Sequence, residues 1–510
     1  MKFVSAQNMR EGEGRAILRT PALDQTLMDH AGRGLTGVIA EMATHLDHPD
    51  PGIRLLAGPG NNGGDVFAAA LFLADMGFAP EIWIACPVEK IKGAARHFFD
   101  EAAAEEIPWH ELLAAEDWDP VRDVAPPPIL VDGLLGTGGQ GAPTGIIRAA
   151  IEYLNVKSRE CLVISADISS GMNADTGAAA GPVVQADYTV TMGFPKAGMA
   201  APAAAEALGS LRSVSIGLPG EFADAIPDAR PGLQWISEAD VRRILPRRRR
   251  DSHKGTYGRA LLLGGSPAYP GAIVLAAEGA ARSGAGLVRV ATVESAASAV
   301  VVRVPEAIIG ADLSPDFPLA GTDAILAGPG LGRDPEARRL VARLLHETPG
   351  PLVLDADAIA VLEGKPEVVK NCAHPVVLTP HPGELARLLG TDAAAIQRDR
   401  LTAAQKAAEL TGAIVVLKGA GTLVAKTGQP VWINLNGNPG MACGGSGDVL
   451  AGLLAGLLAQ KLDPLQAACA AVWLHGTAGD IAALQKTQAA MKAGDIARCL
   501  PAAFRQARLR

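Results

Sequence analysis

Short apolar runs alternate with helix-length segments along almost the whole chain, and this alternation limits the possible folds more than any other feature. In the first half the strand-like runs are IRLLAG (53–58), EIWIAC (81–86), ILVDG (129–133), CLVISADI (161–168) and DYTVTMG (187–193). Strands separated by helix-length connections pair in parallel, and helices then cover both faces of their sheet. The sequence therefore predicts an α/β fold built on parallel sheets.

The alternation stops near residue 220 and starts again near residue 253. The stretch between is rich in proline and charge, which is typical of a linker with a short helix. With 510 residues the chain is too long for one hydrophobic core. We therefore predict two α/β domains, 1–220 and 253–505, with 221–252 as a linker and a helix leading into the second. The strand-like runs of the second half are 260–265, 287–292, 324–330, 352–357, 376–380, 414–419 and 422–426.

Charge and composition exclude several classes of partner. The formal net charge of −8 and an aromatic content of 4% argue against nucleic acid. The six cysteines occur singly, as expected of reduced thiols in the cytoplasm. The N-terminus meets charge too early for a signal peptide, and the apolar run after Asp448 is too short to span a membrane. We predict a cytoplasmic protein with no membrane partner.

A glycine-rich loop, GPGNNGGD (58–65), joins the first strand-like run to a helix-like segment. Loops at the carboxyl end of a parallel strand are the usual ligand sites of α/β proteins. Glycines let backbone N–H groups approach an anion there, and the helix N-terminus adds favourable partial charge. The spacing matches neither GxGxxG nor the P-loop. The loop therefore indicates a phosphate or dinucleotide site of another kind, or a tight structural turn.

Polar side chains follow two further strands of the first half. Asp132 opens the loop VDGLLGTGGQG, and Asp167 and Ser170 lie in SADISSGMNADTG. Asn62, Asp132 and Ser170 would bring hard oxygen ligands to neighbouring strand ends. Each residue alone is typical of a turn cap, but the three together predict an alkali or alkaline-earth cation.

Four stretches together resemble the NAD(P)H-hydrate epimerase family over nearly all of residues 1–215: AGPGNNGGDVFAAALFL, VDGLLGTGGQG, SADISSGMNADTG and GFPKAG. The resemblance implies a Rossmann-like domain that inverts carbon 6 of the hydrated nicotinamide ring, with K⁺ held by Asn62, Asp132 and Ser170. It also implies that the hydrated dinucleotide contacts Asn61, Asn62, Gly63, Gly64, Asp65, Gly136, Thr137, Gly138, Gly139, Gln140, Gly141, Ala142 and Asp167.

Asp167 is the carboxylate that we expect to transfer a proton at that carbon. The alternative is a role as a ligand of the ribose or of the cation. Lys196, in GFPKAG, either meets a phosphate or is solvated. Val66 stands where the family often has glycine, and the larger valine side chain would narrow the substrate pocket.

The stretch NPGMACGGSGDVLAGLL (438–454) is the most specific signal of the second half. Its glycines let N–H groups point into one small space at a helix N-terminus. An anion hole beside a carboxylate suits phosphoryl transfer, with Asp448 removing a hydroxyl proton. Gly452 and Gly456, four residues apart, are expected to allow close helix packing. The stretch VLKGAGTLVAK (416–426) indicates a turn that seats a nucleotide between two strands, or an ordinary hairpin.

With HKGTYGRALLLGGS, GAARSGAGLVRVAT, AGPGLG, LVLDADAI and LTPHPGE, these stretches resemble the ADP-dependent NAD(P)H-hydrate dehydratase branch of the ribokinase-like superfamily over most of 235–500. The resemblance implies Mg²⁺ and ADP as co-substrate, although no side chain decides between ADP and ATP. Ala360 stands where the family has asparagine, so a contact by that side chain is left open. The implied nucleotide contacts are Lys418, Gly419, Ala420, Gly421, Thr422 and Gly447, and the implied substrate contacts are Ala272, Gly330, His381 and Asp448.

The two resemblances together imply a homo-oligomeric, bifunctional repair enzyme. It would interconvert the R and S forms of hydrated NADH and NADPH, and dehydrate the S form while ADP becomes AMP and phosphate. Phosphate leaves carbon 6 far more readily than hydroxide, which gives nucleotide consumption a chemical purpose. The alternatives are a ribokinase-type kinase of a pyrimidine or vitamin alcohol with an accessory dinucleotide-binding domain, and a catalytically inactive nucleotide-binding scaffold.

Overall fold

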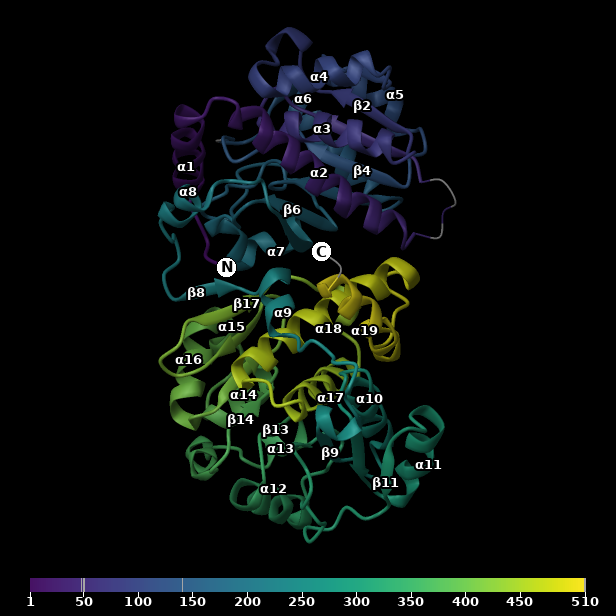
Figure 1. The fold of residues 1–510 in the computed structure, drawn as a ribbon, viewed down its shortest axis with the longest axis vertical. Helices are drawn as coiled ribbons and strands as arrows, with labels where there is room; N and C mark the ends of the chain where they lie inside the picture. The colour runs from purple at the N-terminus through teal and green to yellow at the C-terminus, as the bar shows by residue number, and fades with distance from the viewer. Residues whose placement is uncertain (47, 49–50, 140, 509–510) are drawn as a thin grey trace. The chain divides into compact units, whose positions relative to one another are not determined.

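The computed structural model describes residues 1–46, 48, 51–139 and 141–508, so Gln140 of the predicted substrate loop lies outside the described residues. The chain folds into two compact units, Met1–Pro231 and Gly232–Arg510 (Figure 1). Each unit places helices around a sheet that is wholly or mainly parallel, which confirms the predicted fold class. The limits 1–220, 221–252 and 253–505 stay a prediction.

The sheet of the first unit is parallel throughout its described strands, in the order β3-β2-β1-β4-β5-β6-β7. The strand order reverses between β1 and β4, and in open α/β sheets ligands bind at such a switch point, outside the carboxyl ends of the strands. The strands are β1 (Ile53–Ala57), β2 (Pro80–Ile84), β3 (Trp109–Glu111), β4 (Ile129–Gly133), β5 (Leu162–Ala166), β6 (Tyr188–Met192) and β7 (Ser210–Val214).

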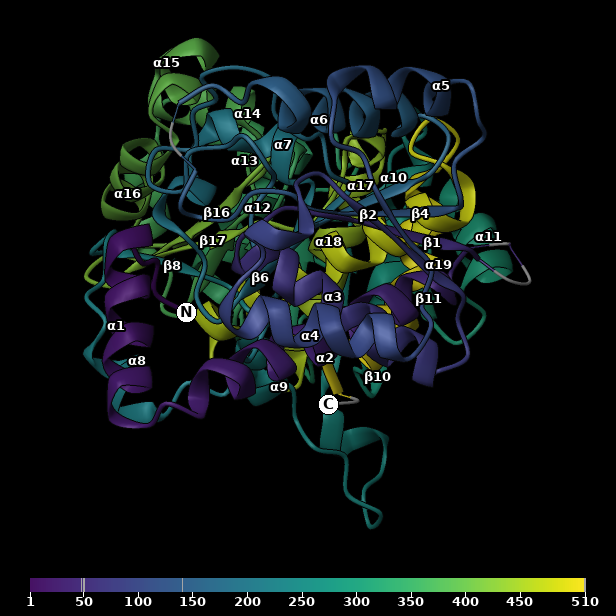
Figure 2. The same cartoon turned by 90° about the horizontal axis from the view of Figure 1, so that it is seen from above.

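Helices pack closely around this sheet. Helix α3 lies on β1 and contacts α2 and α4. Gly32 makes the α2–α3 approach possible, since a Cβ there would lie 2.5 Å from Ala68 Cβ. Helices α1 and α8 lie side by side (Figures 1 and 2). The helices are α1 (Ala6–Arg19), α2 (Leu23–Ala43), α3 (Asn61–Asp75), α4 (Gly93–Ala104), α5 (Asp119–Arg122), α6 (Gly145–Lys157), α7 (Ala205–Leu208) and α8 (Gly220–Ala225).

The sheet of the second unit has the order β11-β10-β9-β12-β13-β14-β15-β16-β17-β8. It is parallel from β11 to β15, β16 runs antiparallel to both its neighbours, and the strand order reverses between β9 and β12. The strands are β8 (Leu233–Trp235), β9 (Arg259–Leu263), β10 (Leu287–Ala291), β11 (Ile308–Gly310), β12 (Ala324–Ala327), β13 (Leu352–Leu354), β14 (Val376–Leu378), β15 (Ile414–Leu417), β16 (Thr422–Ala425) and β17 (Val431–Asn434).

Helix α17 runs through the core of the second unit and packs on α10, β9 and β12. A Cβ on Gly452 would lie 1.9 Å from Ala276 O, and one on Gly456 would lie 1.9 Å from Ser283 Oγ. Only glycine permits such an approach, which confirms the predicted packing role. The helices are α9 (Glu238–Ile244), α10 (Pro270–Ala281), α11 (Glu294–Arg303), α12 (Pro335–Glu347), α13 (Asp357–Ala360), α14 (Pro382–Leu389), α15 (Ala393–Arg398), α16 (Arg400–Thr411), α17 (Ser446–Ala459), α18 (Pro464–Lys486) and α19 (Ala493–Arg508).

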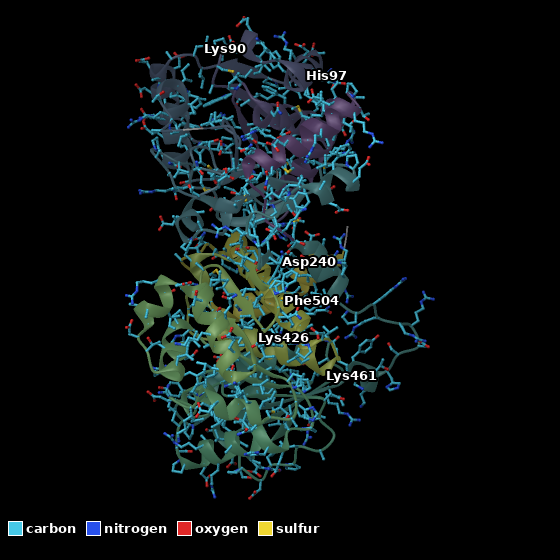
Figure 3. All side chains as sticks on the ribbon, turned by 90° about the vertical axis from the view of Figure 1, so that its left-hand side faces the viewer. Lys90, His97, Asp240, Lys426, Lys461 and Phe504 are labelled. Atoms are coloured by element: carbon cyan, nitrogen blue, oxygen red, sulfur yellow. The ribbon has the colours of Figure 1, made fainter. Side chains whose placement is uncertain are left out.

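Helix α18 is the one helix of the described chain that is long and apolar enough to cross a membrane. Its most apolar stretch is 89% buried inside the unit, as expected of a core helix. Helix α9 and helix α19 pack against each other and against α18; Asp240 and Phe504 mark α9 and α19 in Figure 3. All six cysteines are free thiols.

Candidate active sites of the two units

The loops after β1 and β4 touch at the switch point of the first sheet. Gly58 N donates a hydrogen bond to Gly133 O at 3.1 Å. A Cβ on Gly58 would lie 1.9 Å from Leu134 O, so the two loops are in backbone contact. Helix α3 begins directly after the first loop, at Asn61. Asn61 is exposed, whereas the next four predicted substrate residues, Asn62 to Asp65, are buried.

The three predicted cation ligands meet at Leu135. Asn62 Nδ2 donates to Leu135 O at 2.9 Å, and Leu135 N donates to Ser170 Oγ at 2.8 Å. Ser170 Oγ in turn donates to Asp132 Oδ1 at 2.6 Å. Asn62 Oδ1 is buried and has no hydrogen-bond partner among the described residues. A buried amide oxygen without a partner is costly unless something electropositive reaches it, so this cluster has the character of a cation site.

Asp132 is fully buried at the end of β4. Burial raises the pKa of its carboxyl, and hydrogen bonds from Ser170 and Ser165 oppose the shift. A cation beside this carboxylate would offset the cost of burying its charge. Val66, which was expected to narrow the pocket, is buried and packs against Gly133 of β4.

The described part of the loop 136–142 is mostly exposed and lies beside Asn62. A Cβ on Gly136 would lie 3.3 Å from Asn62 Cβ. Thr137 O accepts a hydrogen bond at 3.0 Å from Arg10 Nη1 of α1. Of the predicted substrate residues of this loop, Gly136 therefore lies at the same corner as the start of α3, and Gln140 is not described.

Asp167 follows β5 and is paired with Lys196. The Asp167 carboxylate accepts hydrogen bonds from Lys196 Nζ and from Met192 N, the latter at 2.9 Å. Lys196 is 1% exposed, and its Nζ also donates to Thr191 Oγ1 at 3.0 Å. Of the two roles considered for Lys196 from the sequence, solvation is therefore wrong, because the ammonium is buried against Asp167, whereas a phosphate contact stays a prediction.

The Asp167–Lys196 ion pair affects the pKa values of two further carboxyl groups, Glu13 and Asp65. Burial raises the pKa of Glu13 in α1 to about 7; Lys196 opposes the shift and Asp167 adds to it. Burial also raises the pKa of Asp65 well above its usual value, and Asp167 and Glu13 add to this shift. Glu13 could not be identified as a site residue from the sequence, because one glutamate in a polar N-terminal helix carries no local signal.

In the second unit the N-terminus of α17 presents Asp448 in its first turn. The helix follows Gly445, whose φ of 93° lies in the left-handed region that favours glycine. The first N–H groups of a helix lack intrahelical partners and favour an anion. His475 of α18 fixes this turn, because its Nε2 lies 2.9 Å from Ser446 O. Burial lowers the pKa of His475 to about 4, so the ring is neutral at pH 7.

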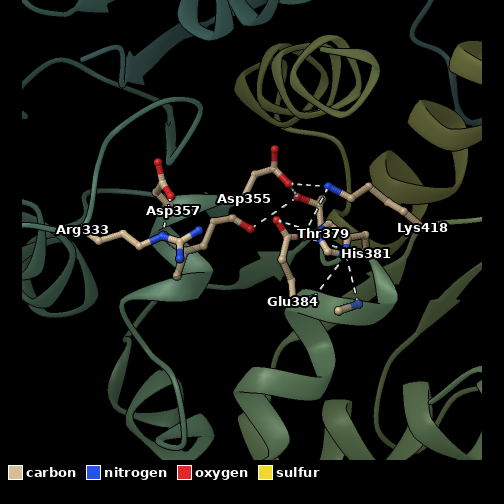
Figure 4. A network of polar contacts seen from close by, with 9 residues as sticks. Arg333, Asp355, Asp357, Thr379, His381, Glu384 and Lys418 are labelled. Atoms are coloured by element: carbon tan, nitrogen blue, oxygen red, sulfur yellow. Dashed lines mark hydrogen bonds and ion pairs between the residues drawn. The ribbon is translucent and has the colours of Figure 1, made fainter. Parts of the chain in front are cut away.

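A cluster of charged side chains lies next to this turn. Figure 4 shows its members Lys418, Asp355 and Glu384. Lys418 Nζ is 2.8 Å from Asp355 Oδ1 and 3.7 Å from Glu384 Oε2. Asp355 Oδ1 also accepts a hydrogen bond from Thr379 Oγ1 at 2.7 Å. A Cβ on Gly447 would lie 3.1 Å from Lys418 Nζ, so the ammonium reaches the start of α17.

The charges of this cluster shift the pKa values of its members. Burial raises the pKa of Asp448 to about 7; Asp355 adds to the shift and Lys418 opposes it. Burial alone would lower the pKa of Lys418, but Asp355 and Glu384 more than offset this and raise it. Asp448 can thus take up a proton near neutral pH beside a lysine that stays charged.

The predicted nucleotide segment Lys418–Thr422 forms the turn between the antiparallel strands β15 and β16. Thr422 Oγ1 donates to Gly419 O at 2.8 Å and closes the turn. Arg400, at the start of α16, donates to three backbone carbonyls around it: Leu417 O, Lys418 O and Gly421 O. The hairpin predicted as one alternative is present, with a lysine that reaches the α17 turn. Arg400 was not among the residues predicted from the sequence.

The predicted substrate contacts Ala272 and Gly330 lie together beside the β9–β12 switch point. Gly330 has a φ of 61°, and a Cβ on it would lie 3.1 Å from Ala272 Cβ. His381 is half-exposed at the start of α14, where its Nδ1 accepts a hydrogen bond from Gly383 N at 3.0 Å. His381 is thus a helix cap whose Nε2 lies 3.5 Å from Glu384 Oε1.

The motif DADAIA contributes a second ion pair near the cluster. Asp357 Oδ1 accepts from Arg333 Nε at 2.8 Å, and Asp357 Oδ2 accepts from Gly332 N at 3.0 Å. Ala360, which replaces the expected asparagine, is partly buried at the end of α13. Among the residues that the structure describes, no three His, Cys, Asp or Glu side chains are arranged to hold a metal ion.

Comparisons with known proteins agree with both halves of this picture. A family model described as NAD(P)H-hydrate dehydratase matches residues 260–502, and one described as YjeF-related protein N-terminus matches residues 24–198. The chain is 39% identical, over 99% of its length and 97% of the relative, to the bifunctional NAD(P)H-hydrate repair enzyme Nnr of Moorella thermoacetica. The protein of the same name from Escherichia coli is 35% identical over 96% of this chain and 92% of its own length.

Among the solved structures that resemble this chain is the ADP/ATP-dependent NAD(P)H-hydrate dehydratase of Bacillus subtilis, co-crystallised with ATP and Mg²⁺. It is 35% identical to this chain, and the match covers 55% of this chain and all of the Bacillus protein, with a TM-score of 0.51.

Proposed function

The chain belongs to the bifunctional NAD(P)H-hydrate repair enzymes, and from this premise we propose which residues perform each of its two reactions. The epimerase site lies at the β1–β4 switch point of the first unit, and the dehydratase site lies at the N-terminus of α17 in the second. The observation that carries the proposal is the position of Asp448: a carboxyl with a pKa of about 7 in the first turn of a glycine-led helix, near the partly buried Lys418.

In the dehydratase reaction Asp448 removes the proton of the carbon 6 hydroxyl of the S hydrate. The resulting oxygen attacks the terminal phosphorus of ADP, and AMP leaves. The ring nitrogen then expels the phosphate from carbon 6, and loss of the proton from carbon 5 restores the dihydropyridine ring. The backbone N–H groups of the glycine-rich loop and of the first turn of α17 stabilise the negative charge on the phosphoryl group in the transition state of its transfer.

The proposed nucleotide-binding site is the turn between β15 and β16, which begins at Lys418. Lys418 Nζ reaches the start of α17 near Gly447, so it can contact a phosphate bound there. Arg400 holds the carbonyls of the turn, which keeps its shape fixed. The proposed nucleotide contacts are Lys418, Gly419, Ala420, Gly421, Thr422 and Gly447. The Bacillus dehydratase is ADP/ATP-dependent, which supports an adenine nucleotide as co-substrate here.

The charge of the cluster around Lys418 fits a divalent cation. One ammonium faces the carboxylates of Asp355 and Glu384, so the cluster is acidic overall. Carboxylate oxygens are the ligands that Mg²⁺ prefers, and Asp355 and Glu384 are the side chains that would hold it. Mg²⁺, when bound, neutralises the charge of the nucleotide phosphates. The nearby residues Ala272, Gly330 and His381 are the proposed contacts of the hydrated ring.

In the epimerase reaction Asp167 is the proposed proton-transfer residue. It stands at a strand end, in contact with Lys196 and near Asp65 of α3. Carbon 6 bears both a hydroxyl and the ring nitrogen, so it can lose water to a nitrogen-stabilised cation and regain it on the other face. The contacts proposed for the dinucleotide are the residues of α3 and of the 136–142 loop named from the sequence.

Asn62, Asp132 and Ser170 are the proposed ligands of K⁺. We predict that K⁺ stabilises the first unit, by about 1.4 kcal/mol at ten times its dissociation constant, and that Asn62→Ala removes this effect because it deletes the unpartnered Oδ1. The measurement is chemical unfolding in KCl and in choline chloride of equal ionic strength. Asn61→Ala, at the exposed neighbouring position, is the control and should keep the effect. A K⁺ effect that survives in Asn62→Ala would contradict the assignment.

The whole proposal is tested by turnover of separated hydrate epimers. With ADP, the S epimer should regain the absorbance of reduced nicotinamide, and phosphate should be released. The rate with ATP should be measured in the same way and compared with the rate with ADP. Without nucleotide, the R epimer should convert to S faster than it does spontaneously. A stable phosphorylated product would instead favour a small-molecule kinase, and tight binding without turnover would favour an inactive scaffold. A homo-oligomer in the cytoplasm, where free thiols persist, stays a prediction.

A further inference from the structure

Helix α1 carries a carboxyl group, Glu13, that the epimerase chemistry above leaves without a role. We propose that Glu13 is a second catalytic residue of this site, which transfers a proton to or from the carbon 6 hydroxyl on the face of the ring opposite to Asp167. The inference rests on the epimerase function proposed above and adds a residue to it.

The N-terminal segment of the chain is fastened to the loop that carries Lys196. Val4 N donates to Pro195 O at 3.0 Å, and Ala197 N donates to Val4 O at 2.8 Å, which makes a parallel bridge between Val4 and Lys196. Ser5 then caps α1 by accepting from Asn8 N at 3.1 Å. Helix α1 therefore starts next to the Asp167–Lys196 pair.

The next turn of α1 touches two loops of the site. Met9 Cε lies 3.0 Å from the position of a Cβ on Gly193, directly after β6. Arg10 Nη1 donates to Thr137 O, in the loop after β4. Residues three and four positions apart share a helix face, so Glu13 lies one turn further along the face that Met9 and Arg10 present. Glu13 therefore lies on the side of α1 that contacts these loops, and its side chain is partly buried.

The charged groups that face Glu13 come from four elements. They are Arg10 on its own helix, Asp65 on α3, Asp167 after β5 and Lys196 after β6. The pKa of Glu13, raised by burial to about 7, keeps much of this carboxyl protonated at neutral pH. Asp167 accepts hydrogen bonds from Lys196 and Met192 instead. One site thus holds a proton donor and a proton acceptor on different elements.

The two residues together account for inversion with balanced atoms and charges. Glu13 gives a proton to the carbon 6 hydroxyl, the C–O bond breaks with its electron pair on oxygen, and water leaves. The ring nitrogen shares its lone pair with carbon 6 to form the cation. A water molecule then adds to the opposite face and passes a proton to Asp167, while the nitrogen regains its pair. The reverse reaction starts with Asp167 protonated and Glu13 ionised.

The test compares Glu13→Gln, Glu13→Asp and Glu11→Gln with the wild-type full-length protein. Glu11 is exposed on the same helix and accepts a hydrogen bond from Gln7 Nε2 at 2.8 Å, so it is the matched control. The R-to-S rate is followed without nucleotide by separating the epimers, after subtraction of the spontaneous rate. We expect Glu13→Gln to lower kcat about 100-fold with KM unchanged, Glu13→Asp to recover part of it, and Glu11→Gln to match wild type. Dehydration of the S epimer with ADP should be the same in all four proteins.

The pH profile separates a proton-transfer role from a structural one. In wild type, kcat/KM should fall as pH rises through about 7, because Glu13 loses the proton that it donates. This limb should be absent in Glu13→Gln. A limb that persists belongs to another group, such as Asp65, and overturns the proposal.

The remaining outcomes are equally decisive. Wild-type kcat in Glu13→Gln, or a change in KM alone, overturns the role of Glu13 but leaves the epimerase function standing. A wild-type protein that does not interconvert the epimers contradicts the epimerase function itself. If Glu13→Gln fails to fold, Glu13→Asp decides: a kcat lowered about 10-fold or more at unchanged KM supports the proposal, and a wild-type kcat overturns it.

Discussion

Replacement of Asp448 by asparagine should abolish dehydration of the S epimer, lowering kcat by about 10⁴-fold. The amide keeps the shape of the side chain but cannot accept the hydroxyl proton, so the oxygen never becomes a nucleophile for the nucleotide. The measurement is the return of reduced-nicotinamide absorbance, with release of phosphate, when ADP is added. Asp392→Asn is the control, because Asp392 is likewise an aspartate at a helix N-terminus, where it caps α15, and asparagine caps equally well.

The pH dependence of this reaction gives an independent check. A base acts only when ionised, so wild-type kcat/KM should rise with pH and level off above about 7, the pKa that burial gives Asp448. Asp448→Asn should still bind ADP in calorimetry and should still interconvert the epimers. Dehydration at a rate within about tenfold of wild type would remove Asp448 from the role of base.

The fold could be predicted as far as apolar runs mark buried strands. The strands nearest the two switch points, such as β1, β4, β9 and β12, are short, largely buried and mainly apolar. Strands β1, β4 and β12 lie within predicted runs, and β9 begins one residue before its run, at Arg259. The predicted runs extend past the strands because the glycine, aspartate and proline that follow belong to the strand-end loops. Strands β3 and β11 were missed because they are three-residue edge strands with exposed or half-exposed residues. Strand β8 falls inside the predicted linker but pairs with β17.

The site could be predicted where its residues are close in the sequence. The glycine-rich loop before α17 and Asp448 in the first turn of that helix lie in one stretch of sequence, which indicates an anion site. The glycine-rich loop before α3 indicates such a site in the same way. Residues that only the tertiary structure brings to a site lie outside any recognisable motif. Glu13 lies on α1, Arg400 on α16 and His475 on α18. Lys196 was recognised, but its partner Asp167 lies 29 residues earlier, and only the fold shows that the two are paired.

Replacement of Asp167 by asparagine should lower R-to-S conversion by about 10³-fold while leaving dehydration of the S epimer with ADP unchanged. Asparagine is the right substitution, because Asp167 has a φ of 57° and asparagine tolerates this left-handed conformation better than alanine does. The measurement follows the R epimer without nucleotide, and the S epimer with ADP, on the same preparation. An unchanged R-to-S rate would leave Asp167 only a binding role.

The same substitution should also destabilise the first unit, because it leaves the ammonium of Lys196 buried without its carboxylate. Removal of one partner of a buried ion pair costs about 3–5 kcal/mol, and Lys196 is 1% exposed. The double variant Asp167→Asn/Lys196→Met removes the buried charge as well, so chemical unfolding should show that it recovers much of the lost stability. Its epimerase activity should stay as low as that of the single variant. Recovery of activity together with stability would mean that Asp167 acts only by holding Lys196, and that the proton is moved by another group.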